Sequence, residues 1–146
     1  MTMLQANILL KRWNKKYSQA NLYLKTGLGT AKTDLQRFTD DSDTAGFVGF
    51  AADWEDRRYF ISYENRFTDA GKFDDFFHQS VQAGWAPYQG DYGDLHTWLM
   101  LRIDHQQKTE DKLIITPLIR LFKGVHLLEA GVSDNSKLLL NYIYRY

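Results

Sequence analysis

Residues 136–146, SKLLLNYIYRY, alternate between two kinds of side chain along their whole length. Successive side chains of a β-strand point to opposite faces of the sheet. One face of this stretch carries only leucine and tyrosine, at Leu138, Leu140, Tyr142, Tyr144 and Tyr146. The other face is mixed, with Leu139, Asn141, Ile143 and Arg145. This alternation predicts a β-strand with one face against an apolar surrounding.

The same alternation runs through most of the chain, whereas the 3.6-residue period of an amphipathic helix is scarce. Each predicted strand is close to the roughly 9–11 residues that a tilted membrane strand needs. No repeat or linker interrupts the series, so we predict one antiparallel up-and-down domain over residues 1–146. The pattern predicts about nine strands, at residues 4–14, 18–30, 44–55, 57–67, 76–88, 94–106, 112–122, 124–132 and 137–146.

The connections between these strands alternate in length. The tight ones are NKKYS, WEDRR, YQGDYG and FKG. The others include the long acidic segments AKTDLQRFTDDSDT and TDAGKFDD and the shorter QQKTED and SDNS. Membrane barrels of bacteria have short turns on the periplasmic side and longer loops outside, and the alternation fits that arrangement.

Composition excludes several other classes of protein. The 18 basic residues balance the 18 acidic ones, so no net field attracts nucleic acid. The absence of cysteine excludes disulfides, thiolate metal sites and thiol nucleophiles. No apolar run approaches the roughly 20 residues of a membrane helix. The opening MTMLQANILLKRW also lacks the basic start and cleavage site of a secretory signal.

Two architectures share this alternation. A soluble barrel of lipocalin type, which binds a small ligand, has its apolar face inside. A transmembrane barrel has its apolar face outside, in lipid. Three features favour the membrane barrel: apolar faces that extend over nearly the whole strand, connections that alternate in length, and aromatic residues near strand ends. These aromatic residues are Trp13, Trp54, Tyr59, Trp85, Tyr88, Tyr142 and Tyr146.

The terminal aromatic residue, preceded by apolar residues at every second position, resembles the C-terminal signal of bacterial outer-membrane β-barrel proteins. The matching positions are Leu138, Leu140, Tyr142, Tyr144 and Tyr146. The resemblance implies an all-β, antiparallel up-and-down transmembrane barrel of about 8–10 strands. It implies residence in the outer membrane, with lipid or lipopolysaccharide and the barrel-assembly machinery as partners.

The strand count conflicts with this resemblance at the N-terminus. Nine strands place Met1 outside the cell if Tyr146 is periplasmic, whereas these bacterial barrels have an even count. We therefore expect the full-length gene to encode a signal peptide and at least one strand before Leu4. A miscounted strand near residues 124–146 is the alternative. In the chain as given, closure would require strand 4–14 to pair with strand 137–146 in a parallel seam.

The inward faces are predicted to carry charges of both signs. Barrels of this size have room for side chains or one small ligand and for no wide pore. We expect a polar network that fills the lumen and a structural, interaction or narrow transport role, with a path for small anions as an alternative. The predicted inward charges are Lys11, Lys25, Asp53, Arg58, Glu64, Arg66, Arg102, Asp104, Arg120, Glu129 and Arg145.

One pair of residues raises an enzymatic alternative. His78 and Ser80 share a strand face and resemble the catalytic pair of outer-membrane lipases and deacylases. Such enzymes need a third group that orients the histidine, and the sequence indicates none. The histidines have no zinc spacing and TDDSDT lacks the pattern of a calcium loop. We therefore predict a protein that is not an enzyme and that binds no metal or cofactor.

Overall fold

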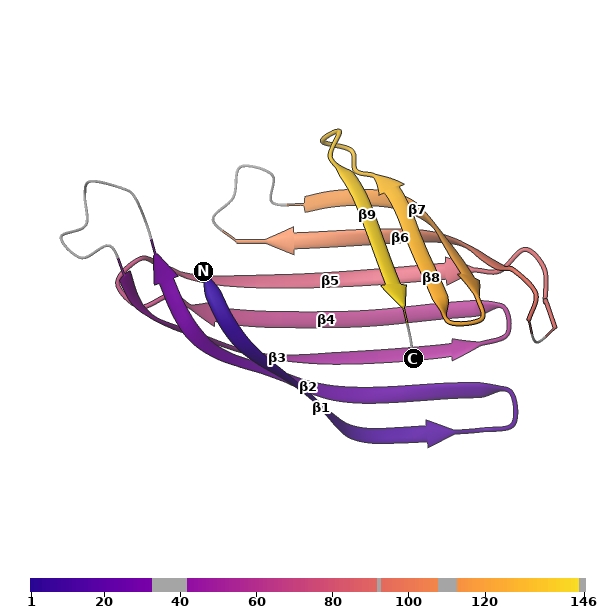
Figure 1. The fold of residues 1–146 in the computed structure, drawn as a ribbon, viewed down its shortest axis with the longest axis horizontal. Coiled ribbons are helices and arrows are strands. Elements are labelled where there is room, and N and C mark those ends of the chain that lie inside the picture. The colour runs from indigo at the N-terminus through magenta and orange to yellow at the C-terminus, as the bar shows by residue number, and fades with distance from the viewer. Residues whose placement is uncertain (33–41, 92, 108–112, 145–146) are drawn as a thin grey trace.

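The computed structural model describes residues 1–32, 42–91, 93–107 and 113–144. These residues form nine β-strands in a single sheet (Figure 1). No helix among them is long and apolar enough to cross a membrane. The strands are β1 (Thr2–Asn14), β2 (Ser18–Lys32), β3 (Ser42–Asp56), β4 (Tyr59–Asp69), β5 (Asp75–Trp85), β6 (His96–Gln106), β7 (Leu113–Lys123), β8 (His126–Val132) and β9 (Leu138–Tyr144).

The sheet is a simple meander. Its spatial order is β1 to β9, and every strand is antiparallel to the strands beside it. The predicted all-β class, the antiparallel up-and-down order and the nine strands are therefore confirmed. The ranges also agree, apart from small shifts at strand ends.

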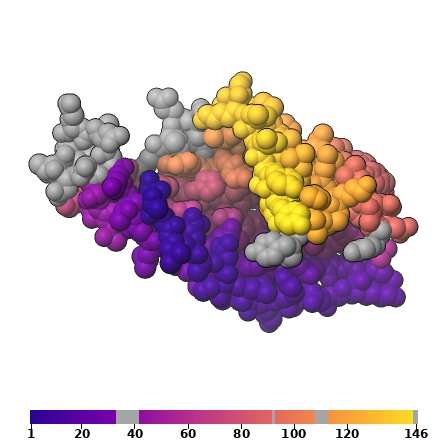
Figure 2. Space-filling model, viewed as in Figure 1, coloured from indigo at the N-terminus to yellow at the C-terminus, as the bar shows by residue number. Residues whose placement is uncertain are grey.

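The predicted closed barrel is wrong for this chain, because the sheet is an open half-barrel. The strand order ends at β1 and β9, and within the described residues these two edges form no ladder with one another. Nine alternating strands leave β1 and β9 running in the same direction, so the antiparallel pattern cannot continue from one to the other. Figure 1 shows β7–β9 curling over the sheet, and Figure 2 shows a hollowed region between β9 in yellow and β1 in indigo.

A bulge in β1 changes which of its charges faces inward. The register with β2 shifts between Leu9 and Lys11, so Lys11 is opposite Leu22 and Arg12 is opposite Asn21. Lys11 was predicted to face inward, but its ammonium lies 5.0 Å from the ring centroid of its neighbour Trp13. An extra residue in one strand reverses the faces of those that follow, and alternation alone does not reveal it.

The two faces of the curled sheet differ in polarity. The convex face exposes large apolar side chains on every strand, for example Leu4, Leu28, Phe50, Ile61, Val81, Leu101, Ile119, Leu128 and Leu140. Buried apolar residues are few among the described residues and half of them are alanine, with a cluster at Ala31, Ala45 and Ala70. The concave face carries the charged side chains of the candidate site. This polarity is the reverse of that in a soluble barrel.

One glycine lets β3 and β4 approach closely, and its replacement is a test of the fold. A Cβ atom at Gly49 would lie 2.1 Å from the backbone oxygen of Asn65 and 3.1 Å from the Arg66 Cα, which are main-chain atoms of β4 and cannot rotate away as a side chain can. We expect Gly49→Ala to lower the free energy of unfolding by about 1–3 kcal/mol. Chemical denaturation of the original protein and of Gly49→Ala under identical conditions measures the difference.

Gly46 in the same strand is the matched control. A Cβ atom there would lie 3.1 Å from the end of the Leu28 side chain, which can rotate away. Gly46→Ala should therefore change the stability by no more than about 0.5 kcal/mol. Equal losses in the two variants would contradict the close approach at Gly49.

Candidate functional site

The concave face holds a largely buried ion pair between β7 and β8. The Arg120 guanidinium donates to the same Glu129 carboxylate oxygen through Nε and Nη2, each at 2.7 Å. Asn141 of β9 donates to the other oxygen at 3.0 Å. The side chains of Arg120 and Glu129 are only 19% and 13% exposed. Three neighbouring strands are thus joined by one charged network.

A second network joins the strands at the opposite edge. Arg12 Nε donates to Asn21 Oδ1 at 2.7 Å, and Asn21 Nδ2 donates to Asp53 Oδ1 at 2.7 Å. Asn21 is buried. Asp53 was predicted to face inward, whereas Arg12 and Asn21 were not singled out. The bulge after Leu9 brings Arg12 to this place.

Further along the strands, Asp104 accepts bonds from several side chains. Arg102 donates to both of its oxygens at 2.8 Å, and His78 Nε2 lies 3.1 Å from Oδ1. Ser80 also bonds to Asp104. An orienting group for His78 is therefore present, contrary to the sequence analysis. However, His78 and Ser80 both contact the carboxylate, whereas a catalytic triad needs the serine bonded to the histidine.

Three more predicted lumen charges, Lys25, Glu64 and Arg66, lie on the concave face. Lys25 Nζ pairs with Glu64 Oε2 at 2.6 Å across the sheet. The Arg66 guanidinium lies 3.6 Å from the centroid of the Phe47 ring and donates to Thr68 Oγ1 at 3.2 Å. The predicted lumen residues therefore belong to separate local clusters of matched partners.

Arg58 was assigned to a strand, and the structure places it elsewhere. It is exposed in the tight turn between β3 and β4. Asp56 Oδ1 accepts the backbone N–H groups of Arg58 and Tyr59, each at 2.6 Å, which stabilises the turn. The predicted strand began at residue 57, whereas β4 begins at Tyr59, so Arg58 was wrongly placed among the lumen residues.

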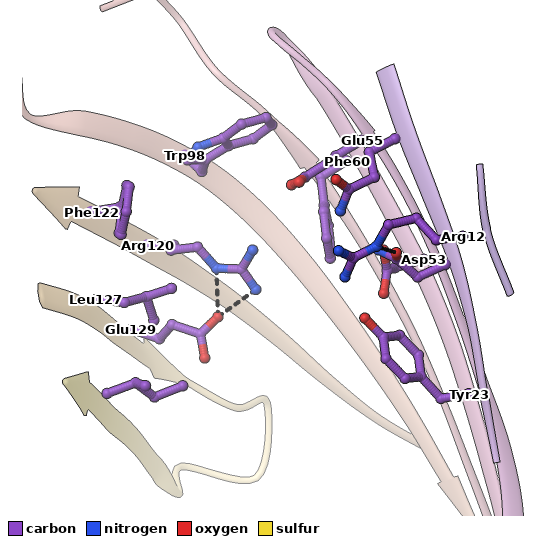
Figure 3. Close-up of a pocket in the computed structure, with 13 residues that line it drawn as sticks. Arg12, Tyr23, Asp53, Glu55, Phe60, Trp98, Arg120, Phe122, Leu127 and Glu129 are labelled. Atoms are coloured by element: carbon purple, nitrogen blue, oxygen red, sulfur yellow. Dashed lines mark hydrogen bonds and ion pairs between the residues drawn. The ribbon is translucent and has the colours of Figure 1, made fainter. Parts of the chain in front are cut away.

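The hollow of the curled sheet is near the tight turns and has a volume of about 460 Å³. Figure 3 shows its two walls facing one another, one formed by the N-terminal strands and the other by the C-terminal strands. Phe60 lies between them, and its ring meets that of Trp98 edge to face at 6.5 Å. The first wall has Arg12, Gln19, Asn21, Tyr23, Asp53 and Glu55. The second has Trp98, Arg120, Phe122, Leu127, Glu129 and Ile143.

This hollow was not predicted from the sequence. Its aromatic residues are on the mixed faces of their strands, which were read as polar. The available signal was an aromatic residue on an otherwise polar face, at Phe60, Trp98 and Phe122. That signal does not show that β4, β6 and β7 place these three aromatic residues around one hollow.

The residues that resemble an assembly signal share one face of β9. Leu138, Leu140, Tyr142 and Tyr144 are all on the convex side and at least half exposed. Tyr142 also hydrogen-bonds His126 Nδ1 at 2.7 Å. Tyr146, the last residue of the signal, and Arg145, predicted to face inward, lie outside the described residues.

No cluster of metal-ligating side chains occurs within residues 1–32, 42–91, 93–107 and 113–144. Part of the TDDSDT segment is not among them. Glu64, Asp104 and Glu129 on the concave face instead accept bonds from lysine, arginine, asparagine or histidine side chains.

Together, these features define the chain as a curled, nine-stranded antiparallel half-barrel with a polar concave face. No known family model, curated protein or solved structure matches the chain. Its class therefore rests on its own geometry.

Proposed function

We propose that the chain forms the wall of a small bacterial outer-membrane β-barrel, with its convex face in lipid and its concave face lining a narrow polar lumen. The proposed role is non-enzymatic, as a structural, interaction or narrow transport component. The observation that carries this proposal is the polarity of the sheet, apolar on the convex side and charged on the concave side.

The extent of the convex apolar surface supports contact with lipid. Leu4, Leu138 and Leu140 are 86%, 74% and 67% exposed. Soluble proteins rarely expose continuous apolar patches larger than a few hundred Å², and larger ones mark membrane or protein contacts. Because apolar side chains of every strand contribute to this surface, a medium that covers the whole face fits better than a local partner.

The polar residues of the convex face also fit this environment. Along the described strands, charged side chains on this face occur only near strand ends. Three of the neutral polar residues further in bond to one another: Tyr63 donates to Gln79 at 3.1 Å, and the Asn65 amide lies 3.5 Å from the Tyr63 hydroxyl. Mutual bonding lowers the cost of polar groups in hydrocarbon.

Aromatic residues of the convex face gather toward the tight turns. Trp13 and Trp54 are both opposite Ala20 in the ladder, and Tyr59 is opposite Trp85. All four are exposed. Membrane barrels carry such aromatic girdles at the level of the lipid head groups.

In lipid, the open edges must be paired. Unpaired backbone groups in hydrocarbon cost several kcal/mol each. Since β1 and β9 run in the same direction, one further strand antiparallel to both would close a ten-stranded, all-antiparallel barrel. We propose this closure in place of a parallel seam between β1 and β9.

Dependence on detergent tests the proposal. After expression and refolding, the protein should stay dispersed with β-sheet circular dichroism only in detergent or lipid vesicles, and it should aggregate on their removal. In vesicles it should resist extraction at alkaline pH. A monodisperse, folded protein in plain buffer would instead support a soluble barrel of lipocalin type.

A further inference from the structure

The first wall of the hollow presents polar groups that have no partner within the chain as described. The Tyr23 hydroxyl and the Gln19 amide make no hydrogen bond there, and Asp53 uses only one carboxylate oxygen. Among the described residues, Arg12 is bonded through Nε alone. Figure 3 shows Tyr23, Asp53 and Arg12 directed toward the hollow. Donors and acceptors are thus available side by side.

The opposite wall is largely apolar. Trp98, Phe122 and Leu127 line it, and Trp98 is near Phe60. A second hollow of about 400 Å³ shares Trp98 and Phe122 with the first and extends to Gln89 in the connection after β5. The hollow therefore continues from Trp98 and Phe122 to the polar tight-turn end, where Glu55, Asp56 and Arg57 also line it.

Charge and aromatic geometry argue against two classes of ligand. A cation would bind over an aromatic face, but the Arg120 guanidinium already lies 4.7 Å from the centroid of Phe60 and would repel it. An anion would meet more carboxylates than guanidinium groups, since Asp53, Glu55 and Glu129 line the hollow with only Arg12 and Arg120. A neutral ligand with both an apolar face and several hydrogen-bonding groups fits the two walls better.

We propose that this hollow binds a neutral saccharide of one or two rings. The apolar face of a sugar ring would pack on Trp98, while its hydroxyl groups would bond to Tyr23, Asp53 and Arg12. The volume lies within the range of about 300–1,000 Å³ typical of ligand pockets. This inference goes beyond the proposed function, because the hollow is on the concave face whatever medium covers the convex one.

Tryptophan fluorescence can report binding at this site alone. Of the four tryptophans, Trp13, Trp54 and Trp85 are exposed on the convex face and Trp98 is on the concave face. Replacing the first three with phenylalanine leaves Trp98 as the reporter. Titration in a zwitterionic detergent without a sugar head group avoids competition. We expect a saturable change in emission with glucose, N-acetylglucosamine, maltose or cellobiose at millimolar concentrations.

Two phenylalanine substitutions complete the test. Tyr23→Phe removes one hydroxyl with no partner in the described chain, so it should leave the fold intact and weaken sugar binding about 3–10-fold, the equivalent of one hydrogen bond. Tyr63→Phe is the same change on the convex face and should leave the affinity unchanged. A protein that retains only Trp54 should show no response.

Three outcomes would overturn the proposal. The first is that none of the four sugars changes Trp98 emission in a saturable way. The second is that choline chloride or sodium phosphate does so while the sugars do not. The third is that Tyr23→Phe and Tyr63→Phe have equal effects. Because the readout is sugar binding by folded protein in detergent, these outcomes are separate from failure of the detergent-dependence test.

Discussion

Replacing Leu101 with arginine is expected to lower the free energy of unfolding in lipid vesicles by about 2–4 kcal/mol, the cost of arginine at the bilayer midplane. Leu101 is in the middle of β6, on the convex face, and is 44% exposed. In the proposed membrane the new guanidinium would be placed in hydrocarbon far from either interface. Urea unfolding of both proteins in the same vesicles measures the difference.

Leu113→Arg is the matched control, because Leu113 is an exposed convex residue at the start of β7. Near the interface the same change should cost only about 0–1 kcal/mol. The difference between the two positions therefore reports depth in the bilayer. If Leu101→Arg had no effect in vesicles, or had its full effect on a protein that is soluble without detergent, the convex face would not be in lipid.

The second large loss of stability is expected when the ion pair between Arg120 of β7 and Glu129 of β8 is disrupted. Arg120→Leu leaves the Glu129 carboxylate, 13% exposed, with Asn141 as a remaining donor. Removing one partner of a fully buried pair costs about 3–5 kcal/mol. Because these side chains keep some contact with solvent, we expect a loss of about 2–4 kcal/mol in unfolding free energy.

A double variant distinguishes the stability that the ion pair contributes from the cost of leaving the Glu129 carboxylate unpaired. Arg120→Leu combined with Glu129→Leu should recover most of the loss, since an apolar pair of similar volume is often as stable as a buried ion pair. Lys25→Leu is the control, because Lys25 and Glu64 are more exposed, at 27% and 39%, and should lose at most about 1 kcal/mol. A double variant as unstable as Arg120→Leu would contradict this account.

Much of the candidate site could be predicted from alternation. Glu64, Asp104 and Arg120 are on the concave face as expected, because successive side chains of a strand alternate between the two faces of the sheet. A shift of one residue would move all of them to the apolar face, so the alternation determines the side on which each residue lies. The exceptions occur where the backbone departs from that period. A bulge in β1 turns Lys11 outward and Arg12 inward, and the tight turn after Asp56 removes Arg58 from the strand.

The ion-pair partner of each charged residue could not be predicted from the sequence. Nothing local distinguishes Glu129 as the partner of Arg120 or Asp104 as that of Arg102 and His78. These pairings depend on cross-strand register, which joins residues far apart in the chain. The same is true of the hollow, whose lining extends from β1 to β9.

The sequence by itself determined the nine strands, their order and the polarity of each face, because these follow from alternation within a strand and from short connections between neighbours. Only the tertiary structure decided that the sheet curls into an open half-barrel, with Arg12 and Ile143 on opposite walls of one hollow. Curvature arises from twist and bulges accumulated over all the strands. Closure depends on whether the first and last edges can pair, and no stretch of a single strand contains that information.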